Sequence, residues 1–491
     1  MNGKIYIFCI GGTGSRVLRS LTMLAAAGVR TDASSIVPII VDPDFANADV
    51  TRTINSMKIY AGIRENLAFN AGTKNDFFNT HIENVLNDYR LPIRDTKNKR
   101  FQEFIEYSTL SKENHALASI LFSEKNLDAD MEVGFKGNPN MGSVVLNQFL
   151  DSQEFVNFCA SFKTNDRIFI VSSIFGGTGA SGFPLLLKTL RGLPNNMPNC
   201  QAIRNAPIGA ITVLPYFAIK PDETSEINSS TFIGKTKAAL QYYEKNVNGN
   251  ESSVNVLYYI GDNRNKQYEN QEGGDEQRNN AHLVEVAAAL SIVDFSNIKD
   301  DSVMTCCLSD SGKVYAPNPL YKEFGIEEDV QQVLCCNLSK ETSDQIMPKM
   351  TQLLLLAKYI HEHANKAIEQ QPWAKDNKID NAYIKAPFYD RLNKFLGLYV
   401  EWLEELQDND RSFKPFNITV SGKDLFTIVA GIEPSKIRAL WALNKNGYDL
   451  FDAILNRVHG SLPHGISLDQ KLIELFNLVT YELVKNKLKL M

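Results

Sequence analysis

The stretch Ser173-Ile-Phe-Gly-Gly-Thr-Gly-Ala-Ser-Gly-Phe-Pro184 decides the fold class of this chain. It follows residues 167–174, whose β-branched side chains predict a strand, and it leads into residues 184–191, which predict a helix. Glycine after a strand lets the backbone come close to a phosphate, and the helix start supplies N–H groups and a positive dipole end. The candidate phosphate-binding residues in this loop are Gly176, Gly177, Thr178, Gly179 and Ser181.

A second glycine turn stands near the start of the chain. Ile10-Gly-Gly-Thr-Gly-Ser-Arg16 follows a predicted strand over residues 4–10 and precedes apolar residues at helical spacing. Gly11, Gly12 and Gly14 are candidates for the same task. No lysine follows either glycine cluster, so the P-loop signature is absent. Two anion cradles in one sheet suggest a single polyphosphate held from two sides.

Further apolar runs complete the fold prediction. Residues 36–41, 207–216 and 254–260 have the length of strands covered on both faces, and they alternate with helical patterns. This alternation predicts a mostly parallel, doubly wound α/β sheet. Residues 262–280 are polar and predict an exposed loop before a helix at 281–293.

The C-terminal part of the sequence has a different pattern. Apolar spacing near 3.6 predicts helices at 350–370, 387–407, 448–458 and 467–489, with short strands at 417–420 and 425–432. We therefore predict a nucleotide-binding domain at 1–300, a connecting segment at 301–346 and a mostly helical domain at 347–491.

Composition narrows the class of protein. The chain has 44% hydrophobic and 22% charged residues, a formal charge of −6, and no apolar run near the ~20 residues that a membrane span needs. The charge argues against nucleic acid or membrane lipid as the main partner. The start of the sequence does not resemble a secretory signal, and the seven cysteines lack C-x-x-C spacing, so we expect free thiols in the cytoplasm.

Three loops together resemble the tubulin/FtsZ superfamily, as in a divergent prokaryotic tubulin-like protein. The family signature G-G-G-T-G-[ST]-G is similar to residues 175–182, with Phe175 in place of one glycine. Gly134-Phe-Lys-Gly-Asn-Pro-Asn-Met-Gly142 resembles the family's G-A-G-A-N-P-E-V-G phosphate loop, and residues 10–16 stand where its first loop stands. Val41-Asp-Pro-Asp44 resembles the tubulin V-D-L-E.

The resemblance implies a guanine nucleotide, GTP or GDP, with Mg²⁺. Asp42 and Asp44 would hold the metal, although an Asx turn would also explain them. Asp262 or Asn263 would contact the base with Asn280, for which a helix N-cap is the alternative. The remaining nucleotide contacts that the resemblance implies are Ser15, Arg16, Lys136, Gly137, Asn138 and, at the ribose, Glu226.

In FtsZ-like proteins, acids after the central helix complete the site of the next subunit, so hydrolysis depends on polymerisation. Val293-Asp-Phe-Ser-Asn-Ile298 resembles the family's N-V-D-F-A-D, but it comes early for a full central helix. Asp294, Asp300 and Asp301 are the candidate catalytic acids, and a solvated acidic turn is the alternative. The resemblance thus implies a self-assembling, filament-forming GTPase whose helical C-terminal region could recruit a protein partner.

Two other functions stay open at this point. One is a tubulin-like module that binds nucleotide without hydrolysing it. The other is a Rossmann oxidoreductase, in which residues 11–14 would hold a dinucleotide pyrophosphate and Asp42 its ribose. The Rossmann interpretation leaves the other two glycine loops unexplained.

Overall fold

The computed structural model describes residues 3–44, 46–69, 74–131, 135, 138–219, 229–247, 254–262, 267–268, 274, 278–303, 307–308, 314–315, 320–323, 330–437, 439–442 and 444–491. Among these residues, six parallel strands form one sheet in the order β10-β6-β4-β3-β1-β2. The strands of this sheet are β1 (Ile5–Ile10), β2 (Ile36–Val41), β3 (Arg167–Ser173), β4 (Ile208–Val213), β6 (Val256–Ile260) and β10 (Leu320–Glu323). Small two-stranded pairs are β5 (Ala218–Ile219) with β7 (Gln267–Tyr268), β8 (Cys307–Leu308) with β9 (Val314–Tyr315), and β11 (Gln332–Val333) with β12 (Ser412–Phe413).

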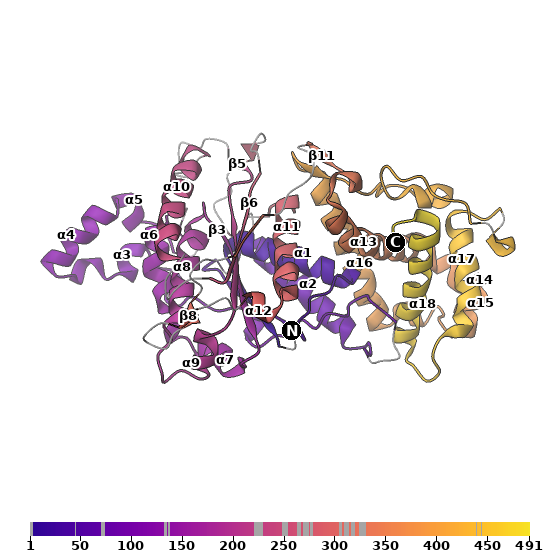
Figure 1. Ribbon diagram of the computed structural model, residues 1–491, viewed down its shortest axis with the longest axis horizontal. Coiled ribbons are helices and arrows are strands. Elements are labelled where there is room, and N and C mark those ends of the chain that lie inside the picture. The colour runs from indigo at the N-terminus through magenta and orange to yellow at the C-terminus, as the bar shows by residue number, and fades with distance from the viewer. Residues whose placement is uncertain are drawn as a thin grey trace.

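Helices pack against both faces of the sheet (Figure 1). On one side are α1 (Gly11–Ala27), α2 (Ala48–Arg64) and α11 (Leu283–Asn297), which share a hydrophobic core with Ile5, Ile7 and Cys9 of β1. The alternate residues Tyr6 and Phe8 belong to the core on the other side. That core is covered by α6 (Pro139–Val145), α7 (Gln153–Ser161), α8 (Gly177–Arg191), α9 (Cys200–Arg204) and α10 (Ser229–Asn246). Burial on both faces explains why each central strand is a continuous apolar run.

The predicted strands agree closely with the observed ones, whereas both glycine turns are shorter than expected. The helix predicted from residue 184 begins at Gly177, with Pro184 inside it, and α1 begins at Gly11. The glycines therefore form the first turns of two helices rather than separate loops. Pro184 removes the helical hydrogen bond to Ala180 O, which instead accepts from Tyr243 Oη at 3.3 Å.

The C-terminal region is helical, as predicted. Its helices are α13 (Lys340–Glu362), α14 (Ala364–Gln370), α15 (Pro372–Asp376), α16 (Pro387–Gln407), α17 (Gly447–Val458) and α18 (Leu468–Glu482). The strands expected at 417–420 and 425–432 are wrong: this segment holds an isolated bridge between Phe416 and Val429 and a short 3₁₀ helix, Gly422–Thr427. The 3₁₀ helix reverses the chain direction, so that only a single bridge and no continuous strand pairing forms.

The C-terminal helices pack directly onto the sheet domain. Helix α16 lies against α2, and α13 lies against α1, so that one hydrophobic core runs from β1 to α18. Trp402 of α16, which is fully buried, donates from Nε1 to Ser20 Oγ of α1 at 3.2 Å. Residues 301–346, predicted as a segment connecting two domains, thus lie between two regions that share one hydrophobic core.

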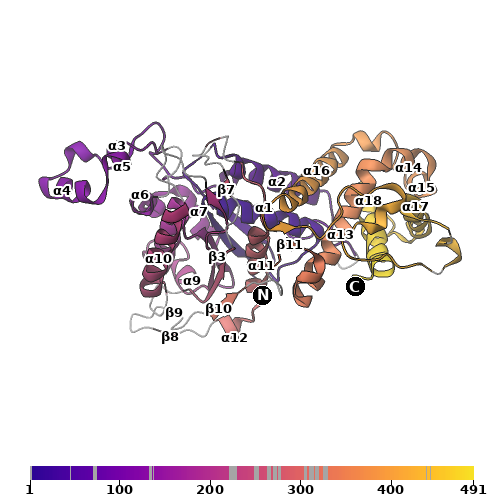
Figure 2. The ribbon, with the colours of Figure 1, turned by 90° about the horizontal axis from the view of Figure 1, so that it is seen from above.

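A helical arm projects from the end of the molecule opposite the C-terminal region (Figures 1 and 2). It contains α3 (Phe101–Phe104), α4 (Lys112–Leu121) and α5 (Glu124–Leu127). The short helix α12 (Asp300–Val303) follows α11 and lies near Arg167, the first residue of β3. In the part of the chain that the structure describes, no helix is both long and apolar enough to cross a membrane.

Candidate functional site

The two glycine junctions meet where the strand order of the sheet reverses. β2 pairs with one edge of β1, and β3 pairs with the other edge. Strands after β2 are therefore added on the opposite side of β1, which makes β1 the point where the strand order reverses. Ligands of open α/β sheets bind at this switch point, outside the carboxyl ends of the strands. A Cβ built on Gly11 would lie 3.6 Å from Thr178 Cβ and 3.9 Å from Gly179 N. The junctions after β1 and β3 are therefore in contact.

Both helices that begin here lack a side-chain cap. The N-cap residues are Ile10 for α1 and Gly176 for α8, and neither residue has a side-chain group that could accept a hydrogen bond from the helix. The first N–H groups of each helix have no partner within it. Gly12, Gly176 and Thr178 are partly exposed at this point, so an anion could reach the two helix ends.

Several of the glycines are also required for packing. A Cβ on Gly14 would lie 2.6 Å from the carbonyl carbon of Cys9, and one on Gly179 would lie 2.5 Å from Ser173 O. Gly142, at the third predicted loop, would bring its Cβ 2.2 Å from Ser181 Oγ. Gly11 adopts φ +72°, which favours glycine. A Cβ on Gly12 would meet nothing closer than Arg16 Nη1 at 3.5 Å, so packing does not explain that glycine.

The two predicted serine contacts are directed inward. Ser15 is fully buried and lies 3.4 Å from Gly11 O, while its own carbonyl accepts from Thr53 Oγ1 at 3.0 Å. Ser181 is 3% exposed and donates to Gly177 O at 2.7 Å. Both hydroxyls are used within the first turns of α1 and α8. Both side chains therefore shape the helix starts, and their contact with a phosphate stays a prediction.

The guanidinium of Arg16 is engaged by protein groups. Its Nε lies 2.5 Å from Glu285 Oε1, its Nη1 lies 2.8 Å from Asp49 Oδ2, and its Nη2 donates to Tyr216 Oη at 2.7 Å. Tyr216 Oη in turn donates to Glu285 Oε1 at 2.8 Å. Burial lowers the pKa of Arg16, but Tyr216, Glu285 and Asp49 outweigh it and hold the pKa above the ordinary value. Two carboxylates neutralise this charge, and a contact between Arg16 and a polyphosphate stays a prediction.

This ion pair belongs to a larger buried network. Asp49 Oδ1 pairs with Arg52 at 2.9 Å, and Arg52 Nη1 pairs with Glu405 Oε1 of α16 at 2.7 Å. Glu405 Oε2 also lies 2.6 Å from Arg19 Nη1 and accepts from Ala281 N at 2.9 Å. Three arginines and three carboxylates alternate through this network, which joins α1, α2 and α11 to the C-terminal region. Buried charges of this kind are tolerated because each one has partners of opposite charge.

Asp42 and Asp44 lie just after β2, beside the β1 junction. Asp42 Oδ1 accepts from Asp44 N at 3.0 Å, and Asp44 Oδ1 accepts from Ala46 N at 3.0 Å. These are Asx turns, the alternative that the sequence left open. Asp44 Oδ2 also accepts from Gly274 N at 2.7 Å. Burial, and the nearby Asp44, raise the pKa of Asp42 to about 7.

A buried carboxyl with a raised pKa beside a second carboxylate fits a divalent cation. Mg²⁺ commonly takes one or two carboxylates and completes its shell with phosphate oxygens and water. Asp42 and Asp44 could supply those ligands, and the ion would neutralise charge on a bound polyphosphate. Among the described residues, no group of three or more His, Cys, Asp or Glu side chains could hold a metal alone. The pair therefore fits an ion shared with a ligand.

The stabilisation by Mg²⁺ should depend on pH. The folded-state pKa of Asp42 is above its ordinary value, so the apo protein loses stability as pH rises from about 4 through 7. Mg²⁺ should then raise Tm at about pH 8 and do little at about pH 5.5, where Asp42 is protonated. Thermal unfolding with MgCl₂, against NaCl of equal ionic strength, measures this. Asp42→Asn should remove the Mg²⁺ effect, and the exposed Asp88→Asn should retain it. Equal shifts at both pH values would contradict the assignment.

The remaining predicted contacts to phosphate, ribose and base are only partly described. Lys136, Gly137, Glu226 and Asn263 lie outside the described residues. Asn280 directs its amide toward Asp408 at 3.4 Å, whereas Asn279 donates from Nδ2 to Asp49 Oδ2 at 3.0 Å. The N-cap of α11 is His282, whose Nδ1 accepts from Val284 N at 3.1 Å.

Three further candidates, Asn280, Asn138 and Asp262, have partners within the protein. Asn279, rather than Asn280, faces the Arg16 network, because Asp49 holds both its backbone and its side chain. Asn138 caps α6 by accepting from Asn140 N at 3.0 Å and Met141 N at 3.3 Å. Asp262, the other base candidate, accepts from Arg411 Nε at 2.6 Å and so faces the C-terminal region. These side chains already have structural partners.

The three candidate acids lie at the opposite end of the sheet from the glycine junctions. Helix α11 begins beside the Arg16 network and ends beside Arg167, the first residue of β3. Arg167 donates to Phe295 O at 2.7 Å and to Ile298 O at 2.8 Å, and it pairs with Asp300. Asp294 is a residue of α11 and accepts from Tyr258 Oη at 2.5 Å. Asp301, in α12, is exposed.

Sequence reasoning missed Asp49, Tyr216 and Glu285, which fix the Arg16 side chain. Glu285 stands three residues after His282, and this spacing is that of a capping box, but with histidine in place of the usual serine or threonine. Asp49 and Arg52 have the helical i, i+3 spacing of an ion pair. These local signals indicate helix starts. They do not indicate which distant residues the side chains meet.

Fold and site together define a class: parallel α/β proteins in which two uncapped helix N-termini meet at the switch point of the sheet. No protein-family model matches the chain, and no curated protein matches it. Among solved structures, it is similar to CetZ from Methanosaeta thermophila strain DSM 6194, with 16% identity over 52% of this chain and 45% of that chain, at a TM-score of 0.27. It is also similar to CetZ2 from Haloferax volcanii, solved as a GTPγS-bound protofilament, with 13% identity over 61% of each chain, at a TM-score of 0.29.

The matches thus span 45% and 61% of the length of these two solved chains.

Proposed function

We propose that this chain is a GTP-binding, tubulin/FtsZ-like protein of the cytoplasm, whose doubly wound sheet holds the nucleotide at its switch point. The observation that supports this most is the contact between the junctions after β1 and β3, which brings two helix N-termini to one place. The N–H groups at these ends suit the phosphates. Gly12, Gly176 and Thr178 are partly exposed there, and Asp42 and Asp44 follow the adjacent strand β2 as the proposed Mg²⁺ ligands.

The preference for guanine rests on the sequence resemblance. Asn263, Glu226, Lys136 and Gly137 remain proposed contacts to the base, ribose and phosphates. The position of Asn279 beside Asp49 makes it a further candidate at the base end of the site. An amide presents one donor and one acceptor, which matches the edge of guanine.

We also propose that copies stack head to tail and that hydrolysis is completed between them. The candidate acids lie at the amino ends of the strands and the glycine junctions at the carboxyl ends, so stacking along the strand direction would bring them together. Asp300 and Asp301 are both exposed, but Asp300 pairs with Arg167 and Asp294 bonds Tyr258, so we propose Asp301 as the acid. As general base, Asp301 would take a proton from the attacking water.

Asp301→Asn should lower GTP hydrolysis by about 100-fold or more and leave GTP binding and pelleting unchanged, because only the proton acceptor is lost. The measurement is phosphate release against protein concentration, with sedimentation of the same samples. The exposed Asp424→Asn is the control.

A mixing experiment tests whether the acid acts on a neighbouring copy. Asp301→Asn retains its glycine junctions, and Gly12→Val retains its acid. If the site forms between copies, a mixture of these two inactive variants regains part of the activity. No recovery in a mixture that still pellets would show that each copy supplies its own acid.

The module that binds without hydrolysing is the second candidate function. It predicts GTP binding with no phosphate release and no pellet at any protein concentration. In that case the C-terminal region, which the Arg16 network links to the nucleotide domain through Glu405, would be the surface that binds a protein partner. A Rossmann oxidoreductase is disfavoured, because a dinucleotide pyrophosphate needs only the first glycine junction.

A further inference from the structure

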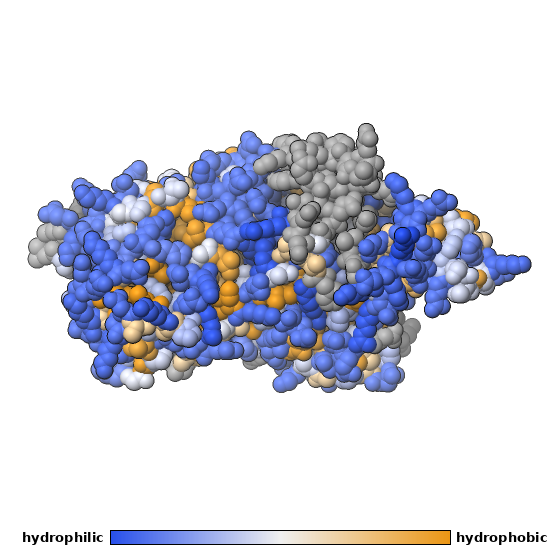
Figure 3. Space-filling view, turned by 180° about the vertical axis from the view of Figure 1, so that it is seen from behind, coloured by the Kyte–Doolittle hydropathy of each residue, from blue (hydrophilic) through white to orange (hydrophobic). Residues whose placement is uncertain are grey.

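The arm carries apolar side chains that its own chain leaves uncovered. On α4, Leu117, Ile120 and Leu121 expose 55%, 81% and 51% of their surface. Their i, i+3, i+4 spacing puts them on one face of the helix. The opposite face is anchored, since Ala118 and Phe122 belong to the core that covers the sheet. Figure 3 shows apolar patches on this arm, which projects at the right in that view. A contiguous exposed apolar face indicates an interaction site.

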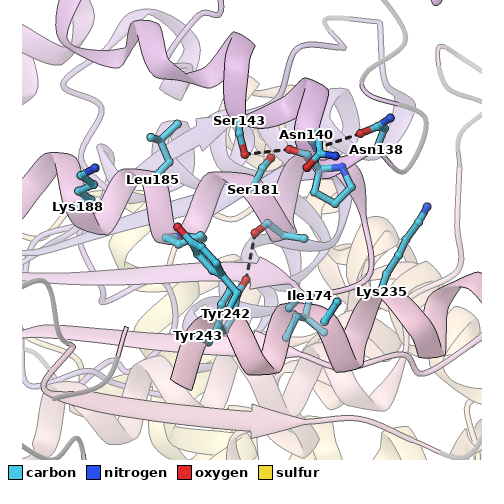
Figure 4. Close-up of a pocket in the computed structure, with 15 residues that line it drawn as sticks. Asn138, Asn140, Ser143, Ile174, Ser181, Leu185, Lys188, Lys235, Tyr242 and Tyr243 are labelled. Atoms are coloured by element: carbon cyan, nitrogen blue, oxygen red, sulfur yellow. Dashed lines mark hydrogen bonds between the residues drawn. The ribbon is translucent and has the colours of Figure 1, made fainter. Parts of the chain in front are cut away.

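A cavity of about 670 Å³ opens between α6, α8 and α10, on the flank of the sheet that bears the arm. Figure 4 shows Tyr242 and Tyr243 of α10 on one side of it and Leu185 and Lys188 of α8 on another. Tyr242 is 52% exposed, and Val144, next to the lining residue Ser143, is 42% exposed. The lining combines apolar side chains such as Ile174, Leu185 and Tyr243 with polar and charged ones, and the volume suits a few large side chains.

The charges of the two surfaces are complementary. The arm, residues 101–130, has six acidic residues and two basic ones. Helix α10 has three lysines and one glutamate, and Lys235 and Lys188 line the cavity. Opposite charge at the rim guides association and fixes its orientation.

We propose that the arm of one copy inserts Leu117, Ile120 and Leu121 into the cavity between α6, α8 and α10 of a second copy. Arm and cavity lie at the same end of the molecule, away from the C-terminal region (Figures 1 and 2). Two copies can thus exchange arms about a two-fold axis, which makes the same contact twice. Because the contact is made twice, the total buried surface area comes closer to the ~1,200–2,000 Å² that stable dimers bury. This pairing is lateral and does not use the β1 junction or Asp301, although Ala180 and Ser181 at the start of α8 also line the cavity.

Sedimentation equilibrium of the full chain without nucleotide tests the proposal. The wild type should be a dimer, and Ile120→Asp or Tyr242→Asp should weaken dimerisation by at least about tenfold, because each places a charge in an apolar contact. Both side chains are more than half exposed, so the fold should survive. Tyr481→Asp, at an exposed tyrosine of the C-terminal region, should leave the dimer intact. A monomeric wild type, or a dimer that both variants retain, would overturn the proposal.

Cross-linking identifies the contact directly. A photoreactive benzoylphenylalanine at position 120 should link to α6, α8 or α10 of a second copy, which mixing isotope-labelled and unlabelled chains distinguishes from its own copy. Links to any other surface, or only within one copy, would overturn the proposal. Because no nucleotide is added, failure of this dimer is distinguishable from failure of GTP binding or head-to-tail stacking.

Discussion

Gly12→Val should weaken GTP binding by at least about 100-fold, or about 2.7 kcal/mol, and leave the fold intact. Gly12 lies in the first turn of α1 and is partly exposed at the junction with α8. A Cβ there meets only Arg16 Nη1 at 3.5 Å and Asn47 Nδ2 at 3.9 Å, both ordinary contact distances. The valine methyl groups would instead occupy the space through which a phosphate reaches the helix N–H groups. Fluorescent GTP titration measures the affinity.

The matched variant is Gly14→Ala, two residues further into the same helix turn. Its Cβ would lie 2.6 Å from the carbonyl carbon of Cys9, so this variant should lower Tm even without ligand. Circular dichroism melts separate the two effects. If Gly12→Val bound GTP like the wild type, the phosphates would not approach the β1 junction, and this part of the site assignment would be wrong.

Glu405→Ala should destabilise the protein by about 3–5 kcal/mol, because it removes one partner from a buried ion network. Glu405 Oε2 lies 2.6 Å from Arg19, Glu405 Oε1 lies 2.7 Å from Arg52, and the carboxylate also accepts from Ala281 N. Its side chain is 8% exposed and that of Arg19 is 3% exposed, so water cannot replace the lost acceptor. Urea denaturation, with the midpoint and slope both fitted, measures the change.

The control for this change is Glu401→Ala, one helical turn earlier on α16. Glu401 pairs with Arg278, whose side chain is 60% exposed, and such surface pairs contribute at most about 1 kcal/mol. Equal effects of the two variants would mean that the buried network is not what fixes α16 to the nucleotide domain.

The sequence predicts the sheet well, because each central strand is an apolar run that both faces bury. Strands β2 and β3 were predicted within one residue, and α16 at its observed bounds. The sequence places the two glycine junctions correctly, but it predicts turns where the structure has the first turns of helices. Glycine is unfavourable inside a helix, so its presence argues for a turn. Here Gly14 approaches Cys9, and Gly179 approaches Ser173, so closely that only glycine fits in the first helical turn.

The roles of individual polar residues could not be predicted in the same way. Arg16 meets Asp49 and Glu285, which are 33 and 269 positions away in the sequence, so no local pattern reveals that its charge is neutralised. Asp42 and Asp44 fit both an Asx turn and a metal site by sequence, and the structure forms the turns while it also buries Asp42. Long-range packing decides such cases.

The same network gives a physical route between the site and the C-terminal region. Gly12 lies beside Arg16, Arg16 pairs with Asp49, Asp49 with Arg52, and Arg52 with Glu405 of α16. The residues at the glycine junction are thus connected to the C-terminal helices through buried, charged contacts. This connection is compatible with either the assembling GTPase or the binding module.

The most direct test of the central proposal is a calorimetric titration of the purified chain with GTP, ATP and NAD⁺, each with Mg²⁺. The proposal predicts one GTP per chain, weaker or absent binding of ATP, no binding of NAD⁺, and loss of the GTP signal in Gly12→Val. Binding of NAD⁺ with no heat from GTP would contradict it and would favour a dinucleotide-binding enzyme on the same sheet.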